Sequence, residues 1–336
     1  CLARSWSAEG APGARPLGWS TLKGSAVLDR LQPVMEHGRH VRTQVDKIVE
    51  VVHWMAYEEL PRTDYQIPLR VGEGSADEVI DFVLTADCVD TAFTDFSTHV
   101  KFQVDYAGRN WSDSDALFAC MKRAMDNGIP ILDGKFLARV TRPELERIFA
   151  ANIELPMLDE KMQVWHDVGA VLADKYNGRF HNFVKSCPPR LYDDGAGIID
   201  RMVKEFPRFD DVSPYDNATI KFYKLPQLGI WFVYSNLRKN NQFPLDDLGK
   251  MTAFADYIVP VALRLLGIVS YSSELEHAIN SYQMVPRDSR QEVEIRAHCI
   301  YATAFPCEEV NKLRHQERHT TIHQKPPTPW PPHPPP

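Results

Sequence analysis

The sequence lacks closely paired cysteines and lacks a long uncharged apolar run. Its six cysteines include no CxxC pair, whereas disulfide frameworks and zinc sites both rely on recurrent cysteine spacings. We therefore predict free thiols in a reducing compartment, the cytoplasm. The best candidate for a membrane-spanning run contains Arg264, and a spanning helix needs about eighteen or more apolar residues with few or no charges. No transmembrane helix is expected.

Excess positive charge and the common short catalytic motifs are also missing. The formal net charge is -7, whereas a protein that binds duplex nucleic acid needs a basic face to displace counterions. The sequence contains no GxSxG, P-loop, HExxH or GxGxxG motif, which leaves the commonest hydrolase and nucleotide-binding signatures without support. A small nucleotide-like substrate would need only a local cation.

Composition divides the chain into three parts. With 44% hydrophobic and 25% charged residues, its 336 residues are typical of a globular protein that buries a sizeable core. Residues 1–24 are rich in Gly, Pro, Ala and Ser and predict a disordered leader. Residues 314–336 are rich in Pro and His and predict a disordered tail. Residues 25–313 form the predicted folded domain.

Helix signals dominate this central part. Ser75 and Thr141 each stand three residues before a Glu, which is the pattern of a capping box. Apolar residues at three- and four-residue spacing predict further helices. These follow Thr43, Ser114 and Met157, include residues 198–206, and follow Ser272 or Ser273 and Asp288 or Ser289. Residues 101–112 alternate around Ala107-Gly108 and predict a β-hairpin, and residues 219–224 read as a second short strand or an extended segment. The expected fold is mainly α: a single globular helical domain with a small β-hairpin, compatible with a DNA-glycosylase-like helical scaffold.

One stretch, residues 251–267, sets a single carboxylate inside a helix-length apolar run. Asp256 has no neutralising partner nearby in sequence, and an unpaired buried carboxylate is costly. Pro260 cannot donate to the carbonyl of Asp256, so the helix must break or kink there. Asp256 is therefore either the N-cap of a helix ending near Leu266 or a catalytic carboxylate on a rigid element.

This stretch resembles the queuosine salvage family of queuosine 5'-phosphate N-glycosylase/hydrolases. The resemblance extends from about Val27 to Leu313. It is carried by several separated blocks in the same order: Gly128-Ile-Pro130, Gly178-Arg-Phe180, Phe206-Pro-Arg-Phe-Asp210, Phe222-Tyr-Lys224 with Gln227, Phe254-Ala-Asp-Tyr257 with Pro260, Gly267, Tyr271-Ser272 and Glu292-Val-Glu-Ile-Arg296. It implies hydrolysis of the bond between a ribose and queuine, a 7-deazaguanine base, without a metal or organic cofactor.

The resemblance also implies roles for individual residues. Breaking an N-glycosidic bond places positive charge on the ribose, so a carboxylate beneath the sugar either stabilises the transition state or attacks it. Asp256 is the implied catalytic residue. The expected substrate contacts are Phe254, Lys224, Tyr257, Gln227 and Phe93. The donor that assists departure of the 7-deaza base is not apparent from the sequence.

The chain departs from the family pattern in three places. Residues 91–96 and 223–227 differ from the family's NFxFW and YKRAQ blocks, and no Asp stands in the tail segment 325–330. The alternative is therefore a catalytically impaired homologue that acts as a nucleoside-binding or scaffold protein. A DNA glycosylase would need a basic surface and a Gly-rich hairpin, and neither is found. Asp87, Asp90 and Asp95 read as solvated charges, and Glu292–Arg296 and Glu294–His298 as surface pairs.

Overall fold

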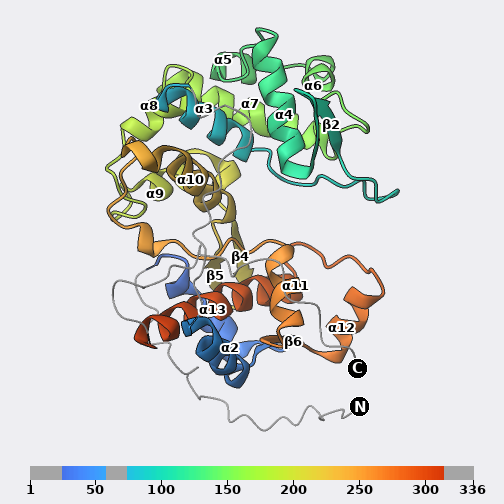
Figure 1. The fold of residues 1–336 in the computed structure, drawn as a ribbon, viewed down its shortest axis with the longest axis vertical. Helices are drawn as coiled ribbons and strands as arrows, with labels where there is room; N and C mark the ends of the chain where they lie inside the picture. Colours follow the sequence, from blue (N-terminus) through green and yellow to red (C-terminus); the bar gives the residue numbers. More distant parts are fainter. Residues whose placement is uncertain (1–24, 58–73, 314–336) are drawn as a thin grey trace. The chain divides into compact units, whose positions relative to one another are not determined.

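A computed structural model describes residues 25–57 and 74–313. The chain forms two compact units, the first from Cys1–Arg62, Val212–Phe222 and Thr252–Pro336, the second from Thr63–Asp211 and Tyr223–Met251. The predicted leader and tail lie outside the described residues, and the single domain over 25–313 stays a prediction. The fold is mainly α with small antiparallel strand pairs (Figure 1), as predicted.

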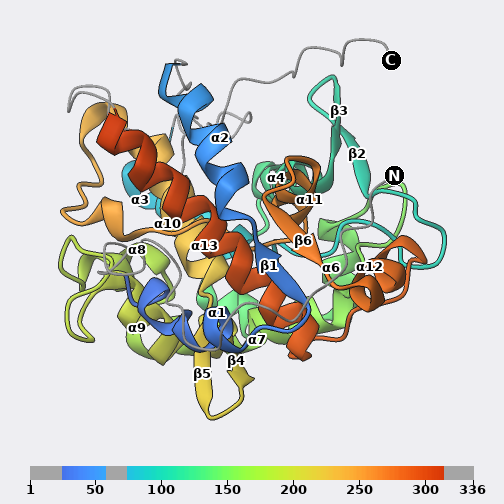
Figure 2. The same ribbon diagram turned by 90° about the horizontal axis from the view of Figure 1, so that it is seen from below.

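The first unit is built around the long helix α13 (Arg290–Leu313). Figure 2 shows α2 (Val45–Tyr57) running beside it, and α1 (Gln32–His37), α11 (Ile258–Leu265) and strand β1 (Val41–Thr43) also pack on α13. Strand β1 pairs antiparallel with β6 (Val269–Tyr271). The unit's other elements are η1 (Leu28–Arg30), the hairpin β4 (Val212–Tyr215) with β5 (Ala218–Lys221), and α12 (Ser273–Asn280).

Glu294 fastens strand β1 to α13. Its side chain is fully buried and accepts hydrogen bonds from three consecutive backbone N–H groups, those of Arg39, His40 and Val41, at 2.6–3.1 Å. The hydroxyl of Tyr215 donates a further bond at 2.9 Å. Several N–H and O–H donors replace the water that a buried carboxylate loses. The prediction of a Glu294–His298 surface pair is therefore wrong, because both side chains are buried.

The second unit packs helices in pairs. Helix α3 (Ala76–Asp87) lies against α10 (Lys224–Leu237) and α8 (Phe180–Lys185), and α7 (Leu158–Lys175) lies against α5 (Gly134–Leu137). The unit's other elements are β2 (Gln103–Tyr106), β3 (Arg109–Ser112), α4 (Asp113–Asp126), α6 (Arg142–Ile148), α9 (Ile198–Glu205), η3 (Pro207–Phe209), η4 (Arg238–Asn240) and η5 (Leu248–Lys250).

Local signals located many elements correctly. The Ser75 hydroxyl accepts from the N–H of Glu78 at the start of α3, and Thr141 and Glu144 form the reciprocal capping box of α6. The hairpin β2–β3 forms as predicted, with Ala107 and Gly108 at positive φ in its turn. The extended prediction holds for β5, but Lys224 begins α10 instead of ending a strand.

Cys88, Cys120, Cys187, Cys299 and Cys307 are free thiols. Among residues 25–57 and 74–313, no helix is both long and apolar enough to cross a membrane.

Candidate functional site

Asp256 caps the helix that follows it. The chain is non-helical through Ala255, and α11 begins at Ile258. Asp256 Oδ1 accepts hydrogen bonds from the N–H groups of Ile258 at 2.8 Å and Val259 at 3.2 Å. Pro260 falls in the first turn, where a missing N–H costs nothing. The capping interpretation is thus correct for the side chain, although the helix starts one residue later than an Asp256 N-cap requires.

Capping uses only one oxygen, Oδ1, of the Asp256 carboxylate. The side chain is half-buried, and its Oδ2 accepts no hydrogen bond from the described residues. The two N–H groups and the helix dipole stabilise negative charge at Oδ1. A helix N-terminus therefore fixes this carboxylate in one orientation.

Arg296 on α13 ties down the segment that carries Asp256. Its Nε donates to the carbonyl of Ala255 at 3.3 Å, and its guanidinium lies 4.0 Å from the ring centre of Phe222. Arg296 also pairs with Glu292 at 3.4 Å. Both side chains of this ion pair are largely buried, so the prediction of an ordinary surface pair is wrong.

The two aromatic residues predicted beside Asp256 differ in exposure. Phe254 is half-buried, whereas Tyr257 is 75% exposed and is not a core residue. Cys299 of α13 also lies near the carboxylate: burial raises the pKa of the Cys299 thiol, and the charge of Asp256 raises it further. The first unit thus places Phe254, Asp256 and Tyr257 on one short segment.

In the second unit, the end of α3 carries a buried acid that lacks a partner. Asp87 is 1% exposed, and neither carboxylate oxygen accepts a hydrogen bond. Burial raises its pKa well above the ordinary value, the charge of Asp90 raises it further, and the charges of Lys224 and Arg208 oppose this shift. Asp90 is also buried. The prediction of solvated charges is therefore wrong for Asp87 and Asp90.

Three basic residues stand around these acids. Lys224 is the first residue of α10, and its backbone N–H donates to Asp211 Oδ2 at 3.2 Å. Arg208, from the FPRFD block, donates from Nε to the carbonyl of Cys88 at 2.7 Å. The third, Lys161, comes from α7. Two of the family-like blocks thus bring their cations to the end of α3.

Lys161 is almost as buried as Asp87. It is 3% exposed and donates from Nζ to the carbonyls of Thr91 at 2.7 Å and Pro156 at 2.6 Å. Burial lowers its pKa to about 8, and the charge of Arg208 adds to this effect. Lys161 therefore anchors the segment that follows α3 by donating hydrogen bonds to neutral carbonyl groups and not to a carboxylate.

The remaining two predicted contacts also belong to the second unit. Gln227 on α10 is fully buried, and its Nε2 donates to the carbonyl of Tyr223 at 3.3 Å. Phe93 is half-buried, with Lys161 Nζ 6.0 Å from its ring centre. Lys224, Gln227 and Phe93 thus occur in one unit, and Asp256, Phe254 and Tyr257 in the other.

Sequence reasoning missed Asp87, although a signal was present. Ile80, Leu84 and Asp87 stand at i, i+4 and i+7, so the acid continues the apolar stripe of α3. A carboxylate on the buried stripe of a helix indicates either a buried partner or a binding function.

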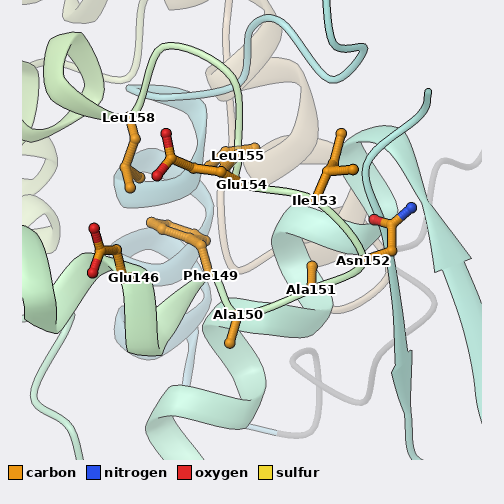
Figure 3. A pocket seen from close by; sticks show the side chains of 9 residues that line it. All are labelled: Glu146, Phe149, Ala150, Ala151, Asn152, Ile153, Glu154, Leu155 and Leu158. Carbon is orange, nitrogen blue, oxygen red and sulfur yellow. The ribbon is translucent and has the colours of Figure 1, made fainter. Parts of the chain in front are cut away.

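A surface hollow lies elsewhere in the second unit. Figure 3 shows its lining side chains between the end of α6 and the start of α7. Its volume is about 290 Å³. Its lining consists of Glu146, Phe149, Ala150, Ala151, Asn152, Ile153, Glu154, Leu155 and Leu158. It includes none of the predicted site residues. Among the residues that the structure describes, no three His, Cys, Asp or Glu side chains are grouped to hold a metal ion.

Comparison with known proteins identifies the family of this chain. The model of the family described as "Queuosine salvage protein" matches residues 71–325. The chain belongs to the queuosine salvage protein family. The matched range includes Asp87, Lys224, Asp256 and the other candidate residues above.

Curated members of the family have similar sequences. A queuosine 5'-phosphate N-glycosylase/hydrolase from Sphaerobacter thermophilus is 30% identical over 275 residues, which cover 82% of this chain and 83% of that protein. Proteins of the same name from Bos taurus and Schizosaccharomyces pombe are 30% and 27% identical, covering 68% and 69% of this chain and 66% and 70% of their own lengths. This chain and its relatives thus share most of their length.

Proposed function

We propose that this protein hydrolyses the N-glycosidic bond of queuosine 5'-phosphate, or of queuosine, and releases queuine for reuse in transfer RNA modification. The observation that carries the proposal is the family membership over residues 71–325, with relatives named for this reaction. In the reaction, water adds to the anomeric carbon while the bond to the base nitrogen breaks, and the base departs with a proton.

Asp256 is the proposed catalytic carboxylate. Departure of the base leaves positive charge on the ribose ring oxygen and anomeric carbon. The orientation of Asp256 by two N–H groups of α11 supports this role, because a preorganised charge stabilises the transition state without reorganising. Oδ2, which accepts no bond from the described residues, is the atom we assign to the anomeric carbon, either as nucleophile or as electrostatic stabiliser.

The other assignments rest on the environments of the side chains. We assign Phe254 and Tyr257 to packing against the base or ribose, since a half-buried and an exposed ring both offer apolar surface. Lys224 is assigned to the phosphate or hydroxyl groups of the substrate. Phe93 is assigned to stacking, and Gln227 to substrate binding through its amide.

The remaining parts of the proposal concern partners and location. The net charge of -7 supports a small-molecule substrate without a nucleic-acid or membrane partner. The free thiols of the described cysteines support a cytoplasmic location.

The test is queuine release from queuosine 5'-phosphate by the purified full chain and by Asp256→Asn. We expect turnover by the wild type and a loss of about 100-fold or more in kcat for the variant, with KM changed little, because the lost charge acts in the transition state.

Asp133→Asn is the matched control. Asp133 is another half-buried acid at a helix N-terminus, and its Oδ1 accepts from the N–H of Lys135 at 2.9 Å. This variant should retain wild-type turnover. A folded wild type that releases no queuine would overturn the proposal in favour of a nucleoside-binding or scaffold protein.

A further inference from the structure

Two buried acids on one helix have contrasting surroundings. Asp81 on α3 accepts hydrogen bonds from the backbone N–H and from Nδ1 of His181, both at 2.8 Å, and lies 3.7 Å from Arg179. Asp87, two turns later, has neither a hydrogen bond nor an ion pair with any described residue. A buried carboxylate without donor partners costs free energy, so a purely structural role explains Asp81 but not Asp87.

The packing around Asp87 fixes its carboxylate. Gly229 on α10 has no side chain to fill this position, and a Cβ there would lie 2.5 Å from Asp87 Oδ2. The side chain of Leu84 also packs close to Gly229, since a Cβ at Gly229 would lie 3.0 Å from Leu84 Cδ2. A glycine in a helix interior costs stability. Here it leaves room for the carboxylate group.

Lys224 and Arg208 favour the ionised form of Asp87 without using its lone pairs, whereas burial and the charge of Asp90 oppose ionisation. Lys224 and Arg208 act on Asp87 through space, against the charge of Asp90. Arg208 directs its Nε to the Cys88 carbonyl and Lys161 directs its Nζ to two other carbonyls. The hydrogen bonds of Arg208 and Lys161 thus go to carbonyl groups, and both oxygens of Asp87 are left without an N–H donor from the described residues.

A carboxylate pairs best with two parallel N–H groups, which give a bidentate contact. The base in the proposed reaction is a 7-deazaguanine, whose N1–H and 2-amino group present such a pair on one edge. A base without the 2-amino group offers only one donor, and an adenine-type base offers an acceptor at N1.

We propose that Asp87 is a specificity-determining residue that accepts two hydrogen bonds from the N1–H and 2-amino groups of a guanine-type base. The choice of base rests on the proposed function, while the acceptor character of the site rests on the structure. Ligand N–H groups supply the hydrogen bonds that the folded chain leaves unmade.

The test compares the binding of two bases to the full chain by calorimetry. The probes are 7-deazaguanine and 7-deazahypoxanthine, which lacks the 2-amino group. A hydrogen bond to a charged group supports roughly tenfold to 100-fold discrimination. We expect the wild type to bind 7-deazaguanine at least about tenfold more tightly, and Asp87→Asn to lose this preference, because its amide replaces one acceptor with a donor.

Asp81→Asn is the control on the same helix and should keep the preference, with circular dichroism reporting that each variant is folded. Equal binding of the two bases by the wild type, or a preference retained in Asp87→Asn, would overturn the proposal. Equal binding by the wild type overturns the proposal even if the variant fails to fold. Queuine release, measured in parallel, separates the two proposals: turnover without base discrimination refutes only the role of Asp87, and discrimination without turnover refutes only the enzymatic proposal.

Discussion

Asp87 is an example of a residue retained at a cost to stability. Burial raises its pKa above the ordinary value of 3.8, so the native chain keeps a proton that the unfolded chain releases. The free energy of unfolding must therefore fall as the pH rises above about 4, until the native pKa is reached. This loss is the consequence of burying a carboxyl group that has no hydrogen-bond partner among the described residues.

We expect Asp87→Asn to remove this pH dependence. The stability of the variant relative to wild type should increase with pH above 4, by at most about 1.4 kcal/mol per pH unit. Urea unfolding at several pH values measures the difference. A difference that is independent of pH would show that Asp87 titrates normally in the folded protein.

His298 has the opposite sign of dependence. It is buried on α13, its Nδ1 lies 2.8 Å from Thr43 Oγ1, and its Nε2 makes no hydrogen bond. Burial, with a contribution from the charge of Arg42, lowers its pKa to about 3 from 6.5. The unfolded chain therefore takes up a proton below pH 6.5 that the folded chain refuses, and stability falls as the pH decreases.

The predicted change for His298→Asn is a weaker acid sensitivity. Between pH 8 and pH 5 the wild type should lose about 2 kcal/mol more unfolding free energy than the variant. Denaturant titrations at both pH values measure this, and equal losses would indicate that another group dominates the acid response.

At the scale of elements, the contact between α5 and α7 depends on glycine. Gly169 on α7 faces α5, and a Cβ at this position would lie 2.4 Å from the backbone N of Ala138 and 2.6 Å from the carbonyl of Gly134. Backbone atoms cannot move aside without shifting a whole helix. The absence of a side chain therefore sets the distance between α5 and α7.

Gly169→Ala should consequently destabilise the protein, although Ala is the better helix former. We expect a loss of about 2 kcal/mol, typical of overpacking, measured by thermal or urea unfolding. Gly249→Ala is the control because its Cβ would meet nothing within 4 Å. Unchanged or increased stability in Gly169→Ala would contradict the contact.

Helix α10 shows where local sequence signals fail. Pro226 and Gly229 disfavour helix in the interior, and most of its residues are buried, so no clear polar face marks the helical period. Proline is tolerated because it is the third residue, and Gly229 because it packs against Asp87. By contrast, α3, α6 and the hairpin β2–β3 carry caps or turns that act over a few residues, and all three were predicted.

At the scale of the whole molecule, charge governs the choice of partner. The chain carries 38 Lys and Arg residues against 45 Asp and Glu residues. Sequence-independent nucleic-acid binding depends on the release of counterions by a basic surface.

We therefore expect no binding of duplex DNA or RNA at about 150 mM salt. Any dissociation constant should be larger, and the binding weaker, than the roughly 10⁻⁴–10⁻⁶ M of nonspecific binders. Fluorescence anisotropy with a labelled duplex measures this. Micromolar binding that weakens steeply with salt would contradict it and would point to a basic surface that net charge conceals.

The candidate site was only partly predictable. Asp256, Lys224 and Arg208 stand in short blocks that the sequence shows directly, and the capping alternative for Asp256 followed from the position of Pro260. The buried state of Asp87 and Lys161 did not follow, because it depends on contacts with residues far away in the chain, such as Gly229 and Thr91.

The sequence by itself determined the helical class, the caps and turns, the family and the choice of Asp256 as the candidate acid. Each of these depends on residues close together in the chain or on short motifs that follow one another in the family's order. Only the tertiary structure decided that Glu294 is saturated by backbone donors while Asp87 has none. Burial and hydrogen-bond satisfaction arise when distant segments pack together, and the same residue type becomes a structural clamp or an available acceptor according to that packing.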